Sequence, residues 1–149
     1  MDTVVIGVGN RMRRDDAAGP LVIDRLTVKA VTGVRLVEVA GDAPEIIDAW
    51  RGVRRAVVVD AVFSGGTPGE VHRVDARRGV PASWRSASSH LVGLAEAVEL
   101  ATALECVPDE LVVYGIEAKN VGPGEGLSRP VAKAMDDLVD AVVEEVTHA

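Results

Sequence analysis

Short apolar runs alternate along this chain with amphipathic segments of helical period, and this alternation is what most constrains its fold. The clearest run, from Arg55 to Val62, is rich in valine and almost continuous, as in a strand that is buried on both faces. Strands that alternate with helices indicate an α/β fold with a mostly parallel sheet between two helical layers. We expect further strands at Thr3–Val8, Val34–Val39, Glu70–Val74 and Glu110–Ile116, and helices at Ala17–Leu26, Ala43–Trp50, Leu91–Leu104 and from Ser128 to about Val146.

One strand is expected to run against the others. The turn Ser64–Gly69 separates Arg55–Val62 from Glu70–Val74, and a parallel crossover needs a dozen or more residues. The predicted architecture is therefore a three-layer αβα sandwich around a five-stranded, mostly parallel sheet, with one antiparallel strand at or near an edge. The polar segment Ala76–Ser88 is predicted to be a loop. With 149 residues and neither a repeat nor a linker, residues 1–149 are expected to form a single domain.

Composition and charge argue against several functions. Lys and Arg number 16 against 23 Asp and Glu, a formal charge of −7, and only 3% of residues are aromatic, so nucleic-acid binding is not expected. No apolar run approaches the roughly 20 residues of a membrane span, and no basic segment precedes the first apolar run, so we expect no membrane association and no signal peptide. Cys106 is the single cysteine, which excludes a disulfide framework and favours a reducing, cytoplasmic location.

Several polar side chains follow the predicted strands. In an open α/β sheet, ligands bind beyond the carboxyl ends of the strands. Asp15 and Asp16 come after the first strand, Asp60 lies near the end of the central run, His90 precedes the third helix, and Glu117 follows the last strand. Two carboxylates and one histidine could therefore meet at one edge of the sheet from three separate loops.

Each carboxylate has a structural and a functional interpretation. One aspartate of the pair Asp15-Asp16 would suffice to cap the following helix, which leaves a ligand role open for the other. Asp60 follows four apolar residues, and a buried carboxylate costs several kcal/mol unless it is paired or binds a metal. Hydrogen bonds to loop amides would satisfy Asp60 structurally, but its position after the central strand favours a functional role.

The histidines differ in their surroundings. His72 is expected to point outward from an edge strand and His148 lies near the C-terminal end, so both are interpreted as surface residues. His90 leads into an apolar helix instead. Two oxygen ligands and one imidazole suit a borderline divalent ion such as Zn²⁺ or Ni²⁺, and a three-ligand set with open positions is typical of a reactive site. The spacing alone is weak evidence, because the sequence contains neither HExxH nor CxxC.

The glycines after the first strand suggest a second possibility. Gly7-Val8-Gly9 resembles the start of a dinucleotide-binding fingerprint, which requires a third glycine where this chain has Met12. Asp15 and Asp16 would also repel a phosphate at the start of the helix. Nucleotide binding is therefore not favoured, and the glycines are interpreted as backbone of a tight turn.

Taken together, these segments resemble the hydrogenase maturation proteases, the endopeptidases that trim the C-terminus of the [NiFe]-hydrogenase large subunit. The resemblance begins with Gly7-Val8-Gly9-Asn10 and Asp15–Pro20 and continues through nearly the whole chain. Its further motifs are Val57–Ala61 with Pro68-Gly69, His90 with Gly93-Leu94-Ala95, Gly115-Ile116-Glu117, and Gly122–Ser128.

The resemblance implies three metal ligands, Asp16, Asp60 and His90, which would also form the catalytic site. The first ligand is Glu in many members and Asp in others. The implied metal is nickel carried by the substrate, for which zinc or cadmium could substitute in a crystal, and the implied partner is the precursor of the large subunit. One segment departs from the family: Val39-Ala40-Gly41-Asp42 replaces an Asp-Gly-Gly motif, which bears on substrate docking and on which hydrogenase is served.

The mechanism and two other functions stay open at this stage. The metal could polarise the scissile carbonyl or activate water, or Asp16 or Asp60 could act as a general base. Cys106 is not expected to be a nucleophile, because no histidine lies near it in the sequence. The alternatives are a nickel-checking chaperone that does not cut, and a small-molecule hydrolase or binding domain on the same scaffold.

Overall fold

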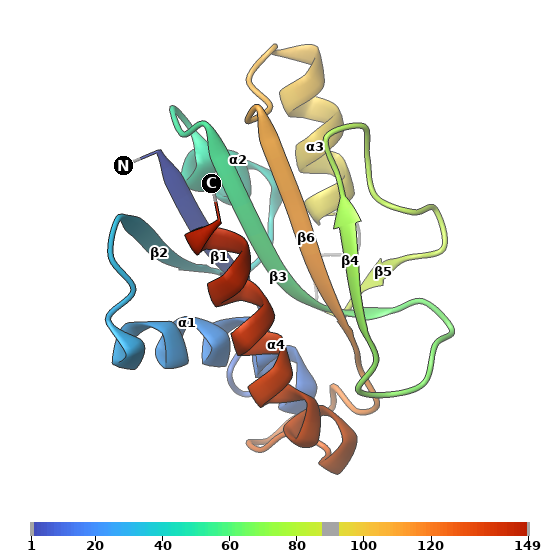
Figure 1. Ribbon diagram of the computed structural model, residues 1–149. Coiled ribbons are helices and arrows are strands. Elements are labelled where there is room, and N and C mark those ends of the chain that lie inside the picture. The colour runs from blue at the N-terminus through green and yellow to red at the C-terminus, as the bar shows by residue number, and fades with distance from the viewer. Residues whose placement is uncertain (1, 88–92, 149) are drawn as a thin grey trace.

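The computed structural model describes residues 2–87 and 93–148 and contains a mixed sheet with helices on both sides (Figure 1). The strands are β1 (Thr3–Val8), β2 (Val34–Val39), β3 (Arg55–Phe63), β4 (Val71–Asp75), β5 (Arg85–Ser86) and β6 (Glu110–Glu117). The helices are α1 (Ala18–Lys29), α2 (Ala43–Trp50), α3 (Gly93–Ala103) and α4 (Arg129–Thr147), and a 3₁₀ helix, η1 (Arg14–Ala17), precedes α1. The predicted start of α3 at Leu91 lies outside the described residues.

The strand order β2-β1-β3-β6-β4 confirms the mostly parallel sheet with an antiparallel edge strand. The edge strand β4 pairs with β6, although β3 precedes it in the chain. Strand β6 therefore lies between β3 and β4 in the sheet. Burial explains this order, because β6 is buried along nearly its whole length and suits an interior position, whereas β4 is half-exposed and suits an edge. The short strand β5, within the predicted loop Ala76–Ser88, pairs antiparallel with the end of β3. Two paired residues leave no pattern that a sequence reading could detect.

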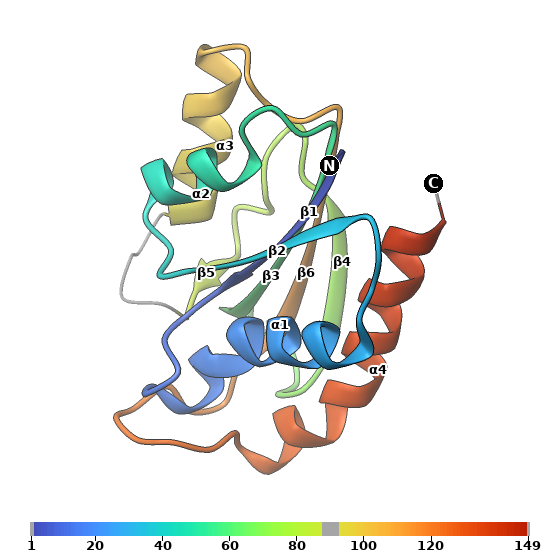
Figure 2. The same cartoon turned by 90° about the vertical axis from the view of Figure 1, so that its left-hand side faces the viewer.

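Side-chain alternation along β3 supplies both halves of the core. Val57 and Val59 pack in the cluster formed with α1 and α4, while Ala56 and Val58 belong to the cluster formed with α2 and α3. Figure 2 shows these two helix pairs on opposite sides of the sheet. The predicted three-layer sandwich is therefore confirmed. None of the helices in the described part of the chain is long and apolar enough to cross a membrane.

Helix α1 lies directly against the backbone of the sheet because two glycines face each other. A Cβ on Gly7 would lie 2.4 Å from the carbonyl oxygen of Gly19. A Cβ on Gly19 would lie 2.5 Å from the oxygen of Val8 and 2.7 Å from that of Val59. Only hydrogen fits at these positions. The contact fixes the height of α1, and of η1 before it, above β1 and β3.

Helix α2 begins as its sequence predicts. Asp42 is the N-cap, its Oδ1 accepting a hydrogen bond from the Glu45 amide at 2.9 Å, and Pro44 lies in the first turn. The Glu45 carboxylate accepts in return from the amides of Ala40 at 2.7 Å and Gly41 at 3.4 Å. The segment 39–42, which departs from the family motif, is therefore held in place by hydrogen bonds to the first turn of α2.

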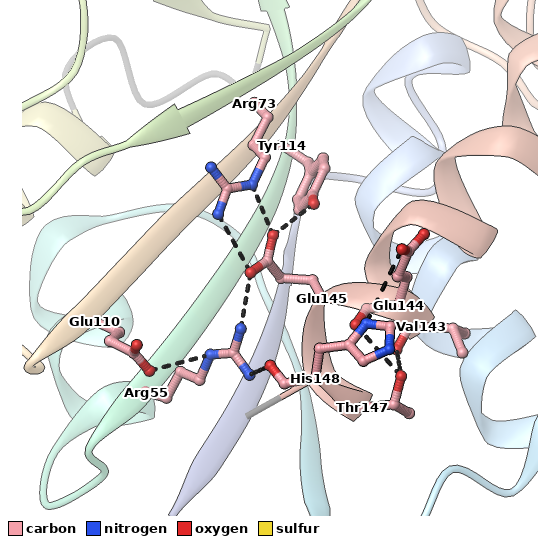
Figure 3. Close-up of polar contacts among 9 residues, drawn as sticks. All are labelled: Arg55, Arg73, Glu110, Tyr114, Val143, Glu144, Glu145, Thr147 and His148. Atoms are coloured by element: carbon pink, nitrogen blue, oxygen red, sulfur yellow. Dashed lines mark hydrogen bonds and ion pairs between the residues drawn. The ribbon is translucent and has the colours of Figure 1, made fainter.

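At the end of the sheet where the parallel strands begin, an ion network that includes the buried Arg55 and the exposed Arg73 attaches α4 to the sheet (Figure 3). The carboxylate of Glu145 accepts from Arg73 Nε, Arg55 Nη2 and Tyr114 Oη, each at 2.7 Å. Hydrogen bonding from Arg73 lowers the pKa of Glu145 to about 2, against the opposing effect of burial. Burial and Glu145 together raise the pKa of Tyr114 to about 12.

Candidate functional site

Asp60 lies inside β3, where its neighbour β1 ends. It is 1% exposed and pairs in register with Val8, the last residue of β1. Strand β3 continues past it to Phe63, so Asp60 is not at a strand terminus as its sequence position suggested. Alternation places its side chain on the same face as Val58, toward the layer of α2 and α3. The predicted burial of this carboxylate is confirmed.

Asp16 lies in η1 and is fully buried. Its Oδ2 accepts a hydrogen bond from the Asn10 amide at 3.1 Å and forms an ion pair with Arg13 Nη1 at 3.5 Å. Its Oδ1 is buried and has no hydrogen-bond partner among the described residues. Burial raises the pKa of Asp16 to about 6, although Arg13 and the Asn10 amide act in the opposite direction.

The turn before η1 brings Asp16 toward the sheet. Gly9 has a φ of +150°, and a Cβ there would lie only 1.8 Å from the Asp16 carbonyl oxygen. Its amide donates to the Val39 oxygen at 3.0 Å, which ties the turn to the end of β2. Gly9 therefore has the turn role that the sequence predicted. The 3₁₀ helix η1 that follows this turn contacts β3, the strand that carries Asp60.

Asp15 has a structural role that differs from capping its own helix. Neither η1 nor α1 has a side-chain N-cap. The Oδ2 of Asp15 accepts from the amides of Lys119 at 2.8 Å and Asn120 at 2.9 Å, and its Oδ1 accepts from the Ser128 amide at 2.7 Å. The Ser128 hydroxyl donates to Oδ2 at 2.8 Å. Asp15 therefore joins η1 to the end of β6 and to the start of α4, while Asp16 retains an open oxygen.

His90, the third predicted ligand, lies outside the described residues. The last described residue before it is Ala87, whose amide donates to the Ala61 oxygen at 2.9 Å. The Ala87 oxygen accepts from Arg13 Nη1 at 3.0 Å. Within residues 2–87 and 93–148, no three His, Cys, Asp or Glu side chains are arranged to hold a metal ion. Convergence of the three ligands therefore stays a prediction.

A second polar cluster, which sequence reasoning missed, lies where β3 and β6 end. The buried Glu117 accepts from the Ser64 amide at 2.9 Å and lies 3.2 Å from His72 Nε2. Burial alone would raise the pKa of Glu117, but the Ser64 hydroxyl and amide, together with His72, hold it below its ordinary value. The expectation that His72 points outward was wrong: its ring packs against Trp84 with centroids 5.8 Å apart. Sequence spacing could not reveal this, since the partners come from three separate elements.

A hollow of about 390 Å³ lies at the carboxyl ends of β1 and β2. Arg11 is part of its lining, and its guanidinium donates to Asp24 at 2.7 Å and to Glu38 at 2.6 Å. Asn10, whose amide binds Asp16, is one of the lining residues. The hollow therefore adjoins the buried carboxylate and includes part of the unusual segment after β2. Its lining consists of Gly9, Asn10, Arg11, Glu38, Val39 and Ala40.

Comparison with known sequences identifies the family. A model of the hydrogenase maturation proteases (HycI) matches residues 21–145, and the chain belongs to this family. Asp60 and His90 lie within the matched range, and Asp16 precedes it. The hydrogenase 3 maturation protease of Escherichia coli K12 is 41% identical over 78 residues, 50% of this chain and 49% of that protein, so the chain spans about half the length of this relative.

Other relatives align over more of the chain. The hydrogenase expression/formation protein HupD of Thiocapsa roseopersicina is 28% identical over 136 residues, 89% of this chain and 61% of that protein. The [NiFe]-hydrogenase maturation protease HybD of Thermococcus kodakarensis superposes with a TM-score of 0.77 at 27% identity, covering 97% of this chain and 98% of that one. The E. coli maturating endopeptidase HybD gives a TM-score of 0.82 at 19% identity over 99% and 93% of the two chains, a likeness in fold alone.

Proposed function

We propose that this protein is an endopeptidase that removes a C-terminal peptide from the nickel-loaded large-subunit precursor of a [NiFe]-hydrogenase. Membership of the maturation protease family supports the reaction class. The structural observation that carries the proposal is the buried Oδ1 of Asp16, which has no hydrogen-bond partner among the described residues and lies on an element that contacts β3. A buried carboxylate oxygen in this state fits a site that is completed by a cation or by a bound peptide.

The proposed ligands are Asp16, Asp60 and His90. They offer two carboxylates and one imidazole, a donor set that suits Ni²⁺. Nickel belongs to the substrate in this proposal, because the precursor brings it already inserted. Three protein ligands leave positions for groups from the precursor, so binding would distinguish a loaded precursor from an empty one. The hollow beside Asn10 is the proposed docking place for the peptide.

Before nickel binds, burial raises the pKa of Asp16 to about 6, so at neutral pH most of the carboxylate is ionised and can accept a cation. A carboxylate that binds nickel no longer has this pKa, so the raised value does not make Asp16 the base. In this proposal the water that attacks the scissile carbonyl is activated by the metal, or gives its proton to Asp16 or Asp60. The cytoplasm, where a lone thiol such as Cys106 stays reduced, is the proposed location.

The deciding experiment compares nickel-loaded and metal-free precursor. Mass spectrometry after incubation with the wild-type protein should show a shortened chain only for the loaded precursor. H90A should leave the loaded precursor intact, whereas H148A, which alters an exposed histidine near the C-terminus, should cut it normally. Full cleavage by H90A would contradict the ligand assignment. Binding of the precursor by the wild type without any shortening would favour the chaperone alternative.

A further inference from the structure

We propose that Arg13 is a positioning residue of the site, which links the carboxylate of Asp16 to the chain segment that leads to His90. This inference rests on the proposed function. Arg13 lies outside the predicted ligand set, and its role follows from the contacts of one guanidinium nitrogen. Nη1 lies 3.0 Å from the Ala87 oxygen and 3.5 Å from Asp16 Oδ2.

The contact at Ala87 extends to the strand of Asp60. The Ala87 amide donates to the oxygen of Ala61, which follows Asp60 in β3, at 2.9 Å. Ala87 is buried and is the last described residue before the range 88–92 that contains His90. Arg13 Nη1 therefore joins η1 to a segment that is itself fastened to β3. This nitrogen and one backbone hydrogen bond therefore link η1, which carries Asp16, to Ala87 and to β3, which carries Asp60.

The backbone of Arg13 is fixed as well. Its amide donates to the Asn10 oxygen at 3.2 Å, and its oxygen accepts from the Asp16 amide at 3.0 Å. A guanidinium that starts from a fixed backbone loses less conformational freedom when it forms two contacts. Its side chain is 30% exposed, so its charge is only partly screened from Asp16. The guanidinium therefore helps to hold the Oδ2 side of the Asp16 carboxylate in place.

The neighbouring Arg14 provides a matched control. It carries the same charge, but Nη1 of its guanidinium reaches the Glu125 oxygen at 3.5 Å. Its guanidinium packs near Gly124, in the loop that precedes α4. R14M therefore removes an identical side chain from the next position, with the contacts of Asp16 and Ala87 left in place.

The first test measures kcat and KM for nickel-loaded precursor with R13M, R13K and R14M. R13M should lower kcat by about 10- to 100-fold with KM changed less than about threefold, because the reacting groups lose their alignment while the docking surface stays. R13K should recover at least about a third of the wild-type kcat, since one nitrogen makes both contacts and an ammonium can replace it. R14M should match the wild type.

The second test does not depend on cleavage. Hydrogen exchange of the Ala87 amide should become about tenfold faster in R13M and stay unchanged in R14M, because the segment loses its contact with η1. If R13M does not fold, R13Q replaces it in both measurements. An inactive wild type would overturn the proposed function, yet faster exchange at Ala87 would still support the link. Wild-type kcat in R13M, unchanged Ala87 exchange, or a loss of kcat that R13K does not recover would overturn the role of Arg13.

Discussion

Asp15 and Asp16 are adjacent in η1 and both fully buried, yet their oxygen atoms meet different surroundings. Among the described residues, the hydrogen bonds to the Asp15 carboxylate come from the loop between β6 and α4 or from Ser128, the residue before that helix. Asp16 is held by the turn of its own segment and keeps one oxygen open among the described residues. Asp15 therefore has a structural role, whereas Asp16 keeps an oxygen that the proposed site can use.

Replacing Asp15 should therefore weaken the fold. D15A leaves the amides of Lys119, Asn120 and Ser128 without their acceptor, and we expect the free energy of unfolding to fall by about 3 kcal/mol. Urea denaturation at neutral pH measures this change. D137A, at an exposed position of α4, is the control and should stay within about 0.5 kcal/mol of the wild type. A D15A variant as stable as the wild type would contradict the structural role.

Replacing Asp16 should stabilise the fold but abolish processing of the precursor. Its pKa is raised from 3.8 to about 6, so the folded state binds the proton more tightly and loses stability as the pH rises through that interval. D16N removes this cost while its amide oxygen can still accept from Asn10. We expect D16N to be more stable than the wild type by about 1–2 kcal/mol at pH 7 and unable to process the precursor. Urea denaturation and mass spectrometry of the precursor check the two parts, and normal processing by D16N would contradict the site.

For single residues, the sequence predicted which side chains are buried better than it predicted which residues they contact. The burial of Asp60 could be predicted, because an aspartate after four apolar residues in the central strand is hard to expose. The partners of Asp15 could not, since Ser128 lies 113 residues away in the chain. The same holds for Arg13, whose contact with Ala87 spans 74 residues. Such contacts depend on how loops meet after the sheet has formed.

The 3₁₀ helix η1, which carries Asp16, is positioned by the following helix α1. The position of α1 depends in turn on Gly19, which lies against the backbone of the sheet. G19A would place a methyl group 2.5 Å from the Val8 oxygen, a backbone atom that cannot move aside. Alanine favours a helix over glycine by about 1 kcal/mol, which is too little to compensate. We expect G19A to lower the free energy of unfolding by about 3 kcal/mol and to reduce processing as η1 shifts. Thermal denaturation and the cleavage assay test this, with E99A on the exposed face of α3 as the control. A G19A variant with wild-type stability would show that the contact is not tight.

Elements with strong local signals were predictable, and those defined by long-range pairing were not. The N-cap Asp42 and the buried run of β3 follow from nearby residues alone. The direction of β4 followed from the short turn before it, but its partner β6 follows in the chain and takes the interior place because it is more apolar. The two-residue β5 and the 3₁₀ helix η1 are too short to show a period.

Across the whole molecule, the ion network of Glu145 and the proposed site lie at opposite ends of the sheet. The Glu145 network lies where the parallel strands begin (Figure 3), whereas Asp16 and Asp60 lie toward their carboxyl ends. E145Q removes the acidic partner of Arg73 and one of the two acidic partners of Arg55, the other being Glu110, so we expect a loss of about 3 kcal/mol in the free energy of unfolding at pH 7. The cleavage rate per folded molecule should not change. Loss of cleavage in a folded E145Q would contradict this separation.

The same network predicts a dependence on pH. The pKa of Glu145 is lowered from 4.5 to about 2, so its contribution to stability is complete above pH 4.5 and disappears as the pH falls through 2. The difference in stability between the wild type and E145Q should therefore shrink between those two values. Denaturation at several pH values measures it, with E144Q, at a neighbouring exposed position, as the control variant. A constant difference across this range would contradict the assignment.

The contact between Gly7 and Gly19 has a consequence for how this chain can diverge. The backbone of α1 touches the backbone of the sheet there, so the spacing between α1 and the strands is set by backbone atoms, which every amino acid has. Exchanges among valine, leucine and isoleucine elsewhere in the interior would alter how firmly the molecule holds together, with little influence on where Asp16 lies. Variants of this chain could therefore change much of their interior and keep Asp16 in the same place, provided that these two positions stay without side chains.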